Sequence, residues 1–188
     1  MAELDVDQIR WTTADLDLMP DDGTHYEVVE GELFMTRAPD LRHQETCFLI
    51  CRALDDWCRP GDIGRAVLGP GVTFDEYSAV IPDVIWISRE RLATTVDAAG
   101  HFTAAPELMI EVLSAGGENE RRDREAKLKL YSLRGVQEYW IADWRLKQIE
   151  VYRRERGRLT LHGTMLADDE LTSPLLPGFA CAVAPLFG

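Results

Sequence analysis

The chain has 188 residues, 46% of them hydrophobic and 28% charged, which is the composition of a globular protein with one sizeable core. No apolar run is long enough to cross a bilayer, and the start, MAELDVDQIR, lacks the apolar segment of a signal peptide, so we expect a cytoplasmic protein without membrane contact. The net charge of −13 excludes a general basic surface for nucleic acid, so any such contact needs a local basic patch or a metal.

The first predicted elements are a short helix, two strands and a long helix. The short helix lies in WTTADLDLMPDD, with Thr12 or Thr13 as its cap and Pro20 at its end. The alternating segment HYEVVEGELFMT predicts two strands with a turn or bend between them. The clearest helix extends from Asp40 to Cys58, because apolar residues recur along it at helical spacing and a Pro-Gly pair follows it.

Further strands follow, with one more helix among them. VTFDEY, PDVIWIS and ELMIEVLS are predicted strands, and PDVIWIS is apolar on both faces, as in a central strand. Residues 90–106 are irregular with at most a helical turn, SAGGENE is a polar loop, and a charged helix covers Arg121 to Leu133. QEYWIAD, KQIEVYRR and RLTLHGT are three more strands, and the tail SPLLPGFACAVAPLF is an edge strand plus loop. Strands around a few helices, without strict alternation, predict a central mixed sheet in an α/β or α+β domain.

Two carboxylates interrupt otherwise apolar strands. Asp83 lies where the chain enters IPDVIWIS, and Glu111 lies in the middle of ELMIEVLS. A carboxylate among apolar neighbours is costly to desolvate unless it is paired, protonated or bound to a metal. On adjacent strands the two could share Mg²⁺, which prefers oxygen ligands and keeps several waters. For Glu111 a salt bridge or an exposed edge-strand face is the alternative.

Other polar candidates have weaker signals. Glu32 lies in the strand GELFMT, where a solvent-facing role is equally consistent with the pattern. His43 falls in the first turn of the long helix near its apolar face, where a packed core histidine is the alternative. His43, Cys47 and Cys51 recur every fourth residue, but zinc usually needs a fourth ligand and none is evident, so we expect buried free thiols instead.

The helix RRDREAKLKLYSLRG supplies basic groups. Lys127 and Lys129 flank its apolar stripe on opposite sides, so helical spacing leaves open which of them points toward the carboxylates. A lysine there could orient the attacking water, help to deprotonate it, or offset charge that develops on phosphorus. A solvated charged face is the alternative for this helix. The candidates for contact with phosphate are Arg121, Arg122 and Arg124.

Several segments occur together in a recognisable order: HYEVVEGELFMT, RHQE at a helix start, IPDVIWIS, APELMIEVLS, DREAKLKLYSLRGVQEYWIAD and SPLLPGF. In this order they resemble the Uma family of bacterial proteins described as restriction endonucleases, within the PD-(D/E)xK nuclease superfamily. The resemblance covers about Trp11 to Phe187 and implies a restriction-endonuclease-like core, a central mixed sheet flanked by helices. We expect one such domain over residues 1–188.

The resemblance also implies roles for particular residues. The PD of the superfamily motif falls on Pro82-Asp83 and its acidic position on Glu111, while Leu113 stands where the motif has lysine. In this family the lysine is displaced to the following helix, which implies Lys127. Glu32 and His43 match the remaining polar positions of the family pattern.

These observations lead to a hypothesis of a metal-dependent endonuclease that hydrolyses DNA with Mg²⁺ or Mn²⁺. Asp83 and Glu111 are the expected metal ligands, Lys127 positions the attacking water, Glu32 is a candidate third carboxylate and His43 is a supporting residue. The alternative is a non-catalytic domain of the same fold that binds a protein or nucleic acid, which the acidic charge favours. We also expect a homodimer, because the family leans toward dimers, one site per chain cuts one strand, and the apolar tail with Trp140 and Trp144 offers exposed apolar surface.

Overall fold

The structure is a computed structural model that describes residues 10–114 and 116–188. Residues 1–9, which enter the expectation about a signal peptide, lie outside the described residues. The helical elements are η1 (Thr13–Leu18), α1 (Leu41–Cys58), α2 (Arg89–Thr95), α3 (Gly117–Arg121), the π-helical η2 (Arg122–Lys127), α4 (Leu128–Arg134) and η3 (Ala184–Phe187).

The strands form three sheets. The six-stranded sheet contains, in spatial order, β10 (Arg158–Met165), β9 (Gln148–Glu155), β8 (Glu138–Asp143), β7 (Leu108–Val112), β6 (Val84–Ser88) and β3 (Gly64–Leu68). The four-stranded sheet contains β2 (Glu32–Thr36), β1 (His25–Val29), β5 (Ser78–Val80) and β4 (Val72–Asp75), and the third sheet contains β11 (Glu170–Thr172) and β12 (Ala180–Ala182).

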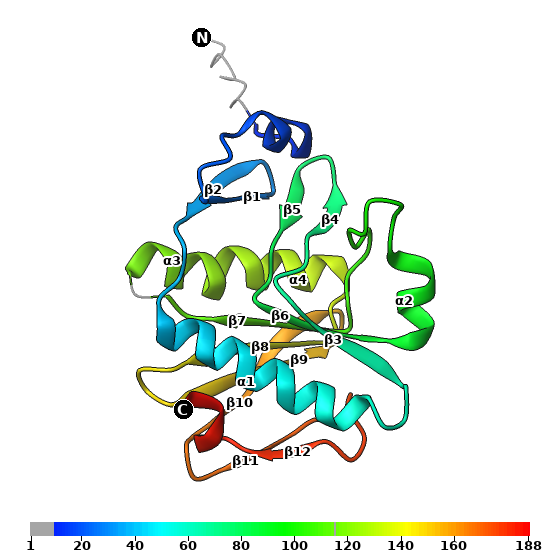
Figure 1. Cartoon of the computed structure of the whole chain (residues 1–188), viewed down its shortest axis with the longest axis vertical. Helices are drawn as coiled ribbons and strands as arrows, with labels where there is room; N and C mark the ends of the chain where they lie inside the picture. The colour runs from blue at the N-terminus through cyan, green and yellow to red at the C-terminus, as the bar shows by residue number, and fades with distance from the viewer. Residues whose placement is uncertain (1–9, 115) are drawn as a thin grey trace.

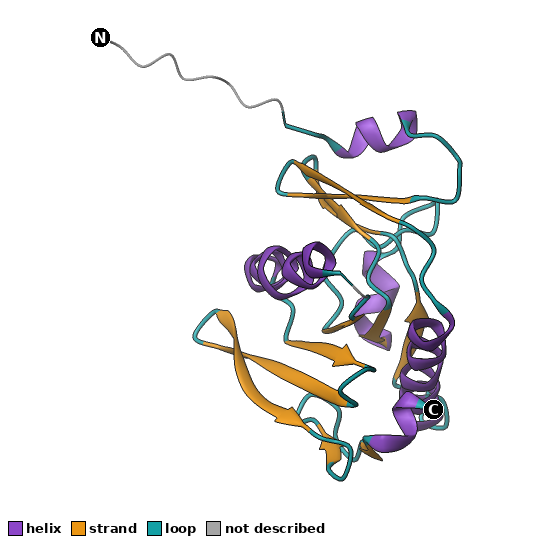
Figure 2. Cartoon of the chain, turned by 90° about the vertical axis from the view of Figure 1, so that its left-hand side faces the viewer, coloured by secondary structure: helices purple, strands orange, loops and turns teal. Residues whose placement is uncertain are grey.

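The large sheet lies between two helical layers. Its strands β7 and β8 are parallel and its other neighbours antiparallel, which confirms the predicted mixed sheet. α1 lies on one side of this sheet, and the continuous helical run from α3 to α4 lies on the other (Figures 1 and 2). Successive residues of β6 enter different cores: Val84 and Trp86 pack with α1, while Ile85 and Ile87 pack with α4. This two-sided burial explains why the strand is apolar throughout.

α1 begins and packs as its sequence predicts. The Asp40 side chain accepts a hydrogen bond from the His43 backbone N–H at 3.0 Å, which satisfies one free donor of the first turn. Its buried apolar residues face the sheet and are Cys47, Ile50, Leu54 and Cys58. The cap and the stripe together place His43 one turn before Cys47 on the buried side.

The second long helix differs from its prediction at both its start and its middle. It begins at Gly117 rather than Arg121, so part of the predicted loop SAGGENE is helical. Its middle segment, η2, is a π-helix, which shifts the residues that face the sheet by one position. The helix ends at Gly135, whose φ of 85° is a left-handed conformation that favours glycine.

The prediction that Trp140, Trp144 and the tail form an exposed apolar surface was wrong, because these segments are mostly buried. Trp140 is fully buried because β8 lies between β7 and β9, and Trp144 is partly buried. The tail contributes to the core beneath α1 through Leu176, Phe179, Val183, Leu186 and Phe187. Across residues 10–114 and 116–188, no helix is both long and apolar enough to cross a membrane.

Candidate active site

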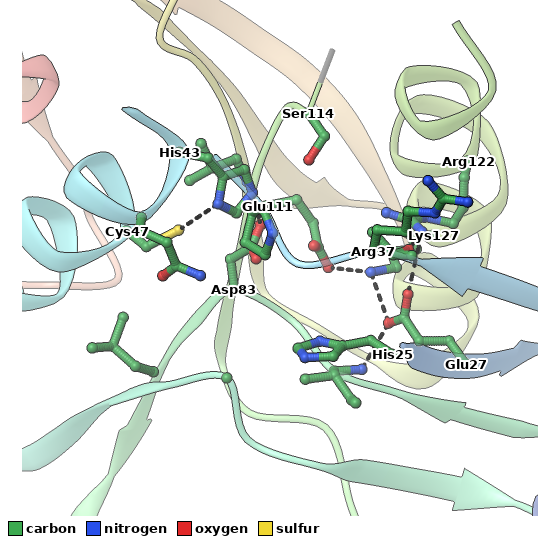
Figure 3. Close-up of a pocket in the computed structure, with 17 residues that line it drawn as sticks. His25, Glu27, Arg37, His43, Cys47, Asp83, Glu111, Ser114, Arg122 and Lys127 are labelled. Atoms are coloured by element: carbon green, nitrogen blue, oxygen red, sulfur yellow. Dashed lines mark hydrogen bonds and ion pairs between the residues drawn. The ribbon is translucent and has the colours of Figure 1, made fainter. Parts of the chain in front are cut away.

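Asp83 and Glu111 lie at the same end of neighbouring strands. In the antiparallel pairing of β6 with β7, Val84 is opposite Ile110, so Asp83 and Glu111 are the next residues along. Asp83 Oδ2 accepts a hydrogen bond from the Val112 backbone N–H at 2.8 Å, which ties the carboxylate to β7. Both carboxylates line a cavity of about 190 Å³ (Figure 3).

Glu111 is buried, and its carboxylate accepts two side-chain hydrogen bonds. Its Oε1 accepts from the Lys127 ammonium at 3.0 Å and from the Tyr131 hydroxyl at 2.7 Å. Burial raises the pKa of Glu111 well above its ordinary value; Lys127 opposes this effect, and neighbouring carboxylates reinforce it. The salt-bridge alternative for this residue is thus present in the structure, but inside a cavity that also contains Asp83.

Lys127 is the lysine that reaches the carboxylates. Its Nζ lies 2.9 Å from Glu27 Oε1 and 3.0 Å from Glu111 Oε1, and its side chain is 1% exposed. Burial alone would lower the pKa of Lys127, but the carboxylates of Glu111, Glu27 and Asp123 outweigh it and raise the pKa, so the ammonium stays protonated. Lys129 instead lies in solvent and pairs with Glu30.

Glu27, which the sequence analysis missed, occupies the position expected of Glu32. Glu27 is buried on β1, and its Oε1 also accepts from the Ile81 backbone N–H at 2.7 Å. Glu32 is exposed on β2 and lines a different hollow on the surface. In the strand HYEVV the residues Glu27, Val28 and Val29 are buried in succession, and this burial depends on packing that the sequence pattern does not show.

The arginines of the second helix are mostly engaged within the protein. Arg122 is buried, donates to Thr36 Oγ1 at 2.6 Å and lies 3.0 Å from Asp123 Oδ1. The other two candidates for phosphate contact also form ion pairs, Arg121 with Glu125 and Arg124 with Glu150. The alternative of a solvated charged face therefore applies to Arg121, whereas Arg122 lines the cavity.

The π-helix explains how this cluster arises from one segment. In a π-helix the hydrogen-bonding residue is five positions away, so Arg122 and Lys127 lie on the same side. Both side chains line the cavity, and Asp123 packs beside them. Single-turn π segments occur frequently at functional sites, and this one brings a cation to Glu111.

His43 completes the other side of the cavity. Its Nε2 lies 3.3 Å from Asp83 Oδ2, and its Nδ1 lies 3.5 Å from Cys47 Sγ. Burial opposes protonation, but the hydrogen bond and charge of Asp83 outweigh it and raise the pKa of His43. Cys47 also lines the cavity, whereas Cys51 is absent from the lining and packs against the core.

Arg37 is a further cation that the sequence analysis missed. It follows β2, lines the cavity and is exposed. Within the described part of the chain no carboxylate pairs with it. Nothing in the local sequence distinguishes it from other surface arginines, because its proximity to the cavity depends on how β2 sits beside η2.

Comparisons with known proteins identify the family and the fold of the chain. The family model described as "Uma2: Putative restriction endonuclease" matches residues 13–184, which is most of the chain. The chain belongs to the Uma2 family. A crystal structure of a "putative nuclease belonging to DUF820" from Anabaena variabilis matches with a TM-score of 0.73 and 21% identity, over 94% of this chain and 97% of that one. That likeness supports the restriction-endonuclease-like fold. No curated protein matches the chain.

Within this Uma2 chain, the lysine reaches the acidic residues from a helix. Leu113, two residues after Glu111, is fully buried in the core that contains α4. The ammonium group of Lys127 enters from η2 and contacts Glu111 from the adjoining layer.

Proposed function

We propose that this protein is a metal-dependent endonuclease that hydrolyses phosphodiester bonds of DNA at the cavity lined by Asp83, Glu111 and Lys127. The observation that carries the proposal is the ion pair of Lys127 with Glu111, at 3.0 Å, in a cavity that also contains Asp83. The family's description as a restriction endonuclease supports the nuclease reaction. The protonated lysine, together with a cation held by the two acidic residues, would stabilise the negative charge that develops in a phosphoryl transition state.

The donor atoms of the cavity fit a hard divalent cation. Asp83 and Glu111 present carboxylate oxygens, the ligands that Mg²⁺ and Mn²⁺ prefer, and would hold the ion. Asp83 is 24% exposed, so the site is open to solvent and to a phosphate group. When bound, such a cation polarises a phosphate oxygen and lowers the pKa of a coordinated water.

Lys127 acts as a hydrogen-bond donor and a positive charge in this proposal. Because neighbouring carboxylates raise its pKa, it holds its proton at neutral pH and does not serve as a general base. Its ammonium would orient the attacking water or stabilise charge on phosphorus. Glu27, at 2.9 Å, fixes the position of that ammonium and so acts as a positioning residue.

His43 supports Asp83 in the same way. Its Nε2 lies 3.3 Å from Asp83 Oδ2, and the Val112 backbone N–H donates to the same oxygen. These two contacts orient the carboxylate and leave its second oxygen available. Glu32 takes no direct part, because its side chain lies outside the cavity.

A nicking assay tests the proposal. Purified protein is incubated with supercoiled, linear and branched DNA, with Mg²⁺ or Mn²⁺ and with chelator. We expect cleavage with the divalent ions and none with chelator, and Asp83→Asn and Glu111→Gln should each abolish it. The exposed Glu32→Gln is the matched control and should retain cleavage.

Absence of cleavage under every divalent ion, together with tight metal-independent binding of DNA or protein, would favour the non-catalytic alternative. The net charge of −13 is the observation that favours this non-catalytic alternative. A homodimer would let two sites cut both strands. The proposal rests on that argument and on the family resemblance, because Trp140 and most apolar residues of the tail are internal.

A further inference from the structure

The side of the cavity opposite Lys127 contains a second cluster of possible metal ligands. His43 and Cys47 come from successive turns of α1, and Asp83 immediately precedes β6 (Figure 3). One ligand atom from each residue lies within 4.8 Å of the others. All three residues line the cavity, so an ion held there would face open space on one side.

The distances suit a tetrahedral ion. With bonds of about 2.3 Å to sulfur and about 2.1 Å to nitrogen, tetrahedral geometry separates the two ligand atoms by about 3.6 Å. Cys47 Sγ and His43 Nδ1 lie 3.5 Å apart. The ligand atoms of His43, Cys47 and Asp83 lie within 4.8 Å of one another, so the largest of these separations must shorten by about 1 Å around an ion of this size. A shift of that size is within the reach of rotation about side-chain bonds.

The donor types select the class of ion. Mg²⁺ takes oxygen ligands, whereas a thiolate and an imidazole favour zinc and related borderline-soft ions. A thiolate and a carboxylate carry two negative charges, which one divalent cation offsets in this buried setting. Three protein ligands with one open position are also the arrangement of zinc sites that bind water or substrate.

We propose that His43, Cys47 and Asp83 form a binding site for a thiophilic divalent cation of the zinc type. Binding breaks the S–H bond of Cys47, forms the metal–sulfur bond and releases the thiol proton to solvent. The third ligand is the strand carboxylate Asp83, whereas the helical repeat pointed to Cys51, which packs into the core away from the cavity. The proposal shares Asp83 with the metal site of the proposed function, but its test measures binding of a thiophilic ion and not DNA cleavage.

Titration of the full-length, metal-free protein with Co²⁺ tests this site. A cobalt ion bound to a thiolate gives a sulfur-to-metal charge-transfer band in the near ultraviolet. We expect the band in the wild type at one equivalent and in Cys51→Ser, the matched control from the next turn of α1. Cys47→Ser should lack it. No band in the wild type, a band that persists in Cys47→Ser, or a band lost in Cys51→Ser would each overturn the proposal.

Competition for Zn²⁺ against a chromophoric chelator provides a second readout. Outer-sphere partners of metal ligands already contribute about 10–100-fold to affinity, so loss of the Cys47 ligand should weaken Zn²⁺ binding by about 100-fold or more. Should Cys47→Ser fail to fold, as judged by circular dichroism, His43→Gln takes its place, and the Zn²⁺ affinity should fall comparably. Unchanged Zn²⁺ affinity in the folded variant would overturn the proposal.

Discussion

Lys127 and Glu111 form an ion pair of 3.0 Å in which neither side chain is more than 2% exposed. Because both side chains are buried, the loss of either partner leaves the other charge poorly solvated, and Glu27 shares the same ammonium at 2.9 Å. Removing one charge from a buried pair typically costs about 3–5 kcal/mol, far more than removing a surface charge. Substitution of either residue should thus affect both activity and the free energy of unfolding, and the two effects are measured in separate experiments.

Lys127→Met should reduce turnover by about 100- to 1,000-fold at saturating DNA, the usual effect of removing a donor that acts in the transition state. DNA affinity should change little. The measurement is a nicking assay beside fluorescence binding, at a temperature where circular dichroism shows the variant folded. Lys129→Met is the control, because Lys129 is exposed and pairs with Glu30. Equal losses in the two variants would contradict the assignment of Lys127.

Glu111 makes stability depend on pH. Its pKa in the folded protein is raised above the ordinary value of 4.5, so between these two values the folded state keeps a proton that the unfolded state has lost. The pair with Lys127 is therefore fully ionic only at pH values above the folded pKa of Glu111. The free energy of unfolding should thus fall as pH rises above 4.5, by up to about 1.4 kcal/mol per pH unit for one proton. His43 acts in the same direction above its ordinary pKa of 6.5, because its folded pKa is also raised.

Urea unfolding at a series of pH values measures this dependence. Glu111→Gln should flatten the decline, because the amide does not titrate. The exposed Glu32→Gln should keep the wild-type decline. A decline that is identical in Glu111→Gln would show that Glu111 is ionised in the folded protein throughout this range.

Mg²⁺ should stabilise the protein through the carboxylates. At 100 times the dissociation constant, a ligand that binds only the folded state adds about 2.7 kcal/mol, which for a domain of this size raises Tm by about 5–10 °C. Asp83→Ala should abolish the shift, and Glu32→Ala should retain it because Glu32 lies outside the cavity. A shift that survives Asp83→Ala would place the cation elsewhere.

Arg37 should contact the DNA backbone. It is exposed, lines the cavity and is free of ion pairs within the described residues, whereas Arg121 pairs with Glu125. Arg37→Ala should lower DNA affinity with little change in turnover at saturation, and it should reduce the slope of log affinity against log salt by about 0.9. Arg121→Ala should have a smaller effect.

Binding of DNA should also strengthen with Mg²⁺, because the cation offsets the negative charge of the acidic residues in the cavity.

Site residues can be predicted from the sequence when they conflict with the local pattern around them. Asp83 and Glu111 are visible because each interrupts an apolar strand, and the structure brings them to one cavity. Lys127 is harder, since helical spacing permits either lysine and a π-helical turn alters the spacing. Glu27 was missed because its strand alternates well enough for a solvent-facing residue, and only the packing of β1 against η2 buries it.

The fold shows the same division. Long periodic segments such as α1 and β6 lie close to their predicted bounds. The short strands β3 and β5 were not predicted. β3 acquires its hydrogen bonds from β6, which is distant in the sequence, while β5 has only three residues and pairs with both β4 and the distant β1. Trp140 was expected in solvent, since local sequence does not reveal that β9 covers the next position in the sheet.

The lysine reaches its carboxylate from η2, a helical layer, and not from the strand that carries Glu111. Activity therefore depends on how firmly that layer is docked, a property separate from the integrity of the sheet. A brief local opening of residues 117–134 would separate the ammonium from the acidic residues while the six strands remain paired. Hydrogen exchange of this helix should then set an upper bound on the fraction of molecules that are competent at any moment.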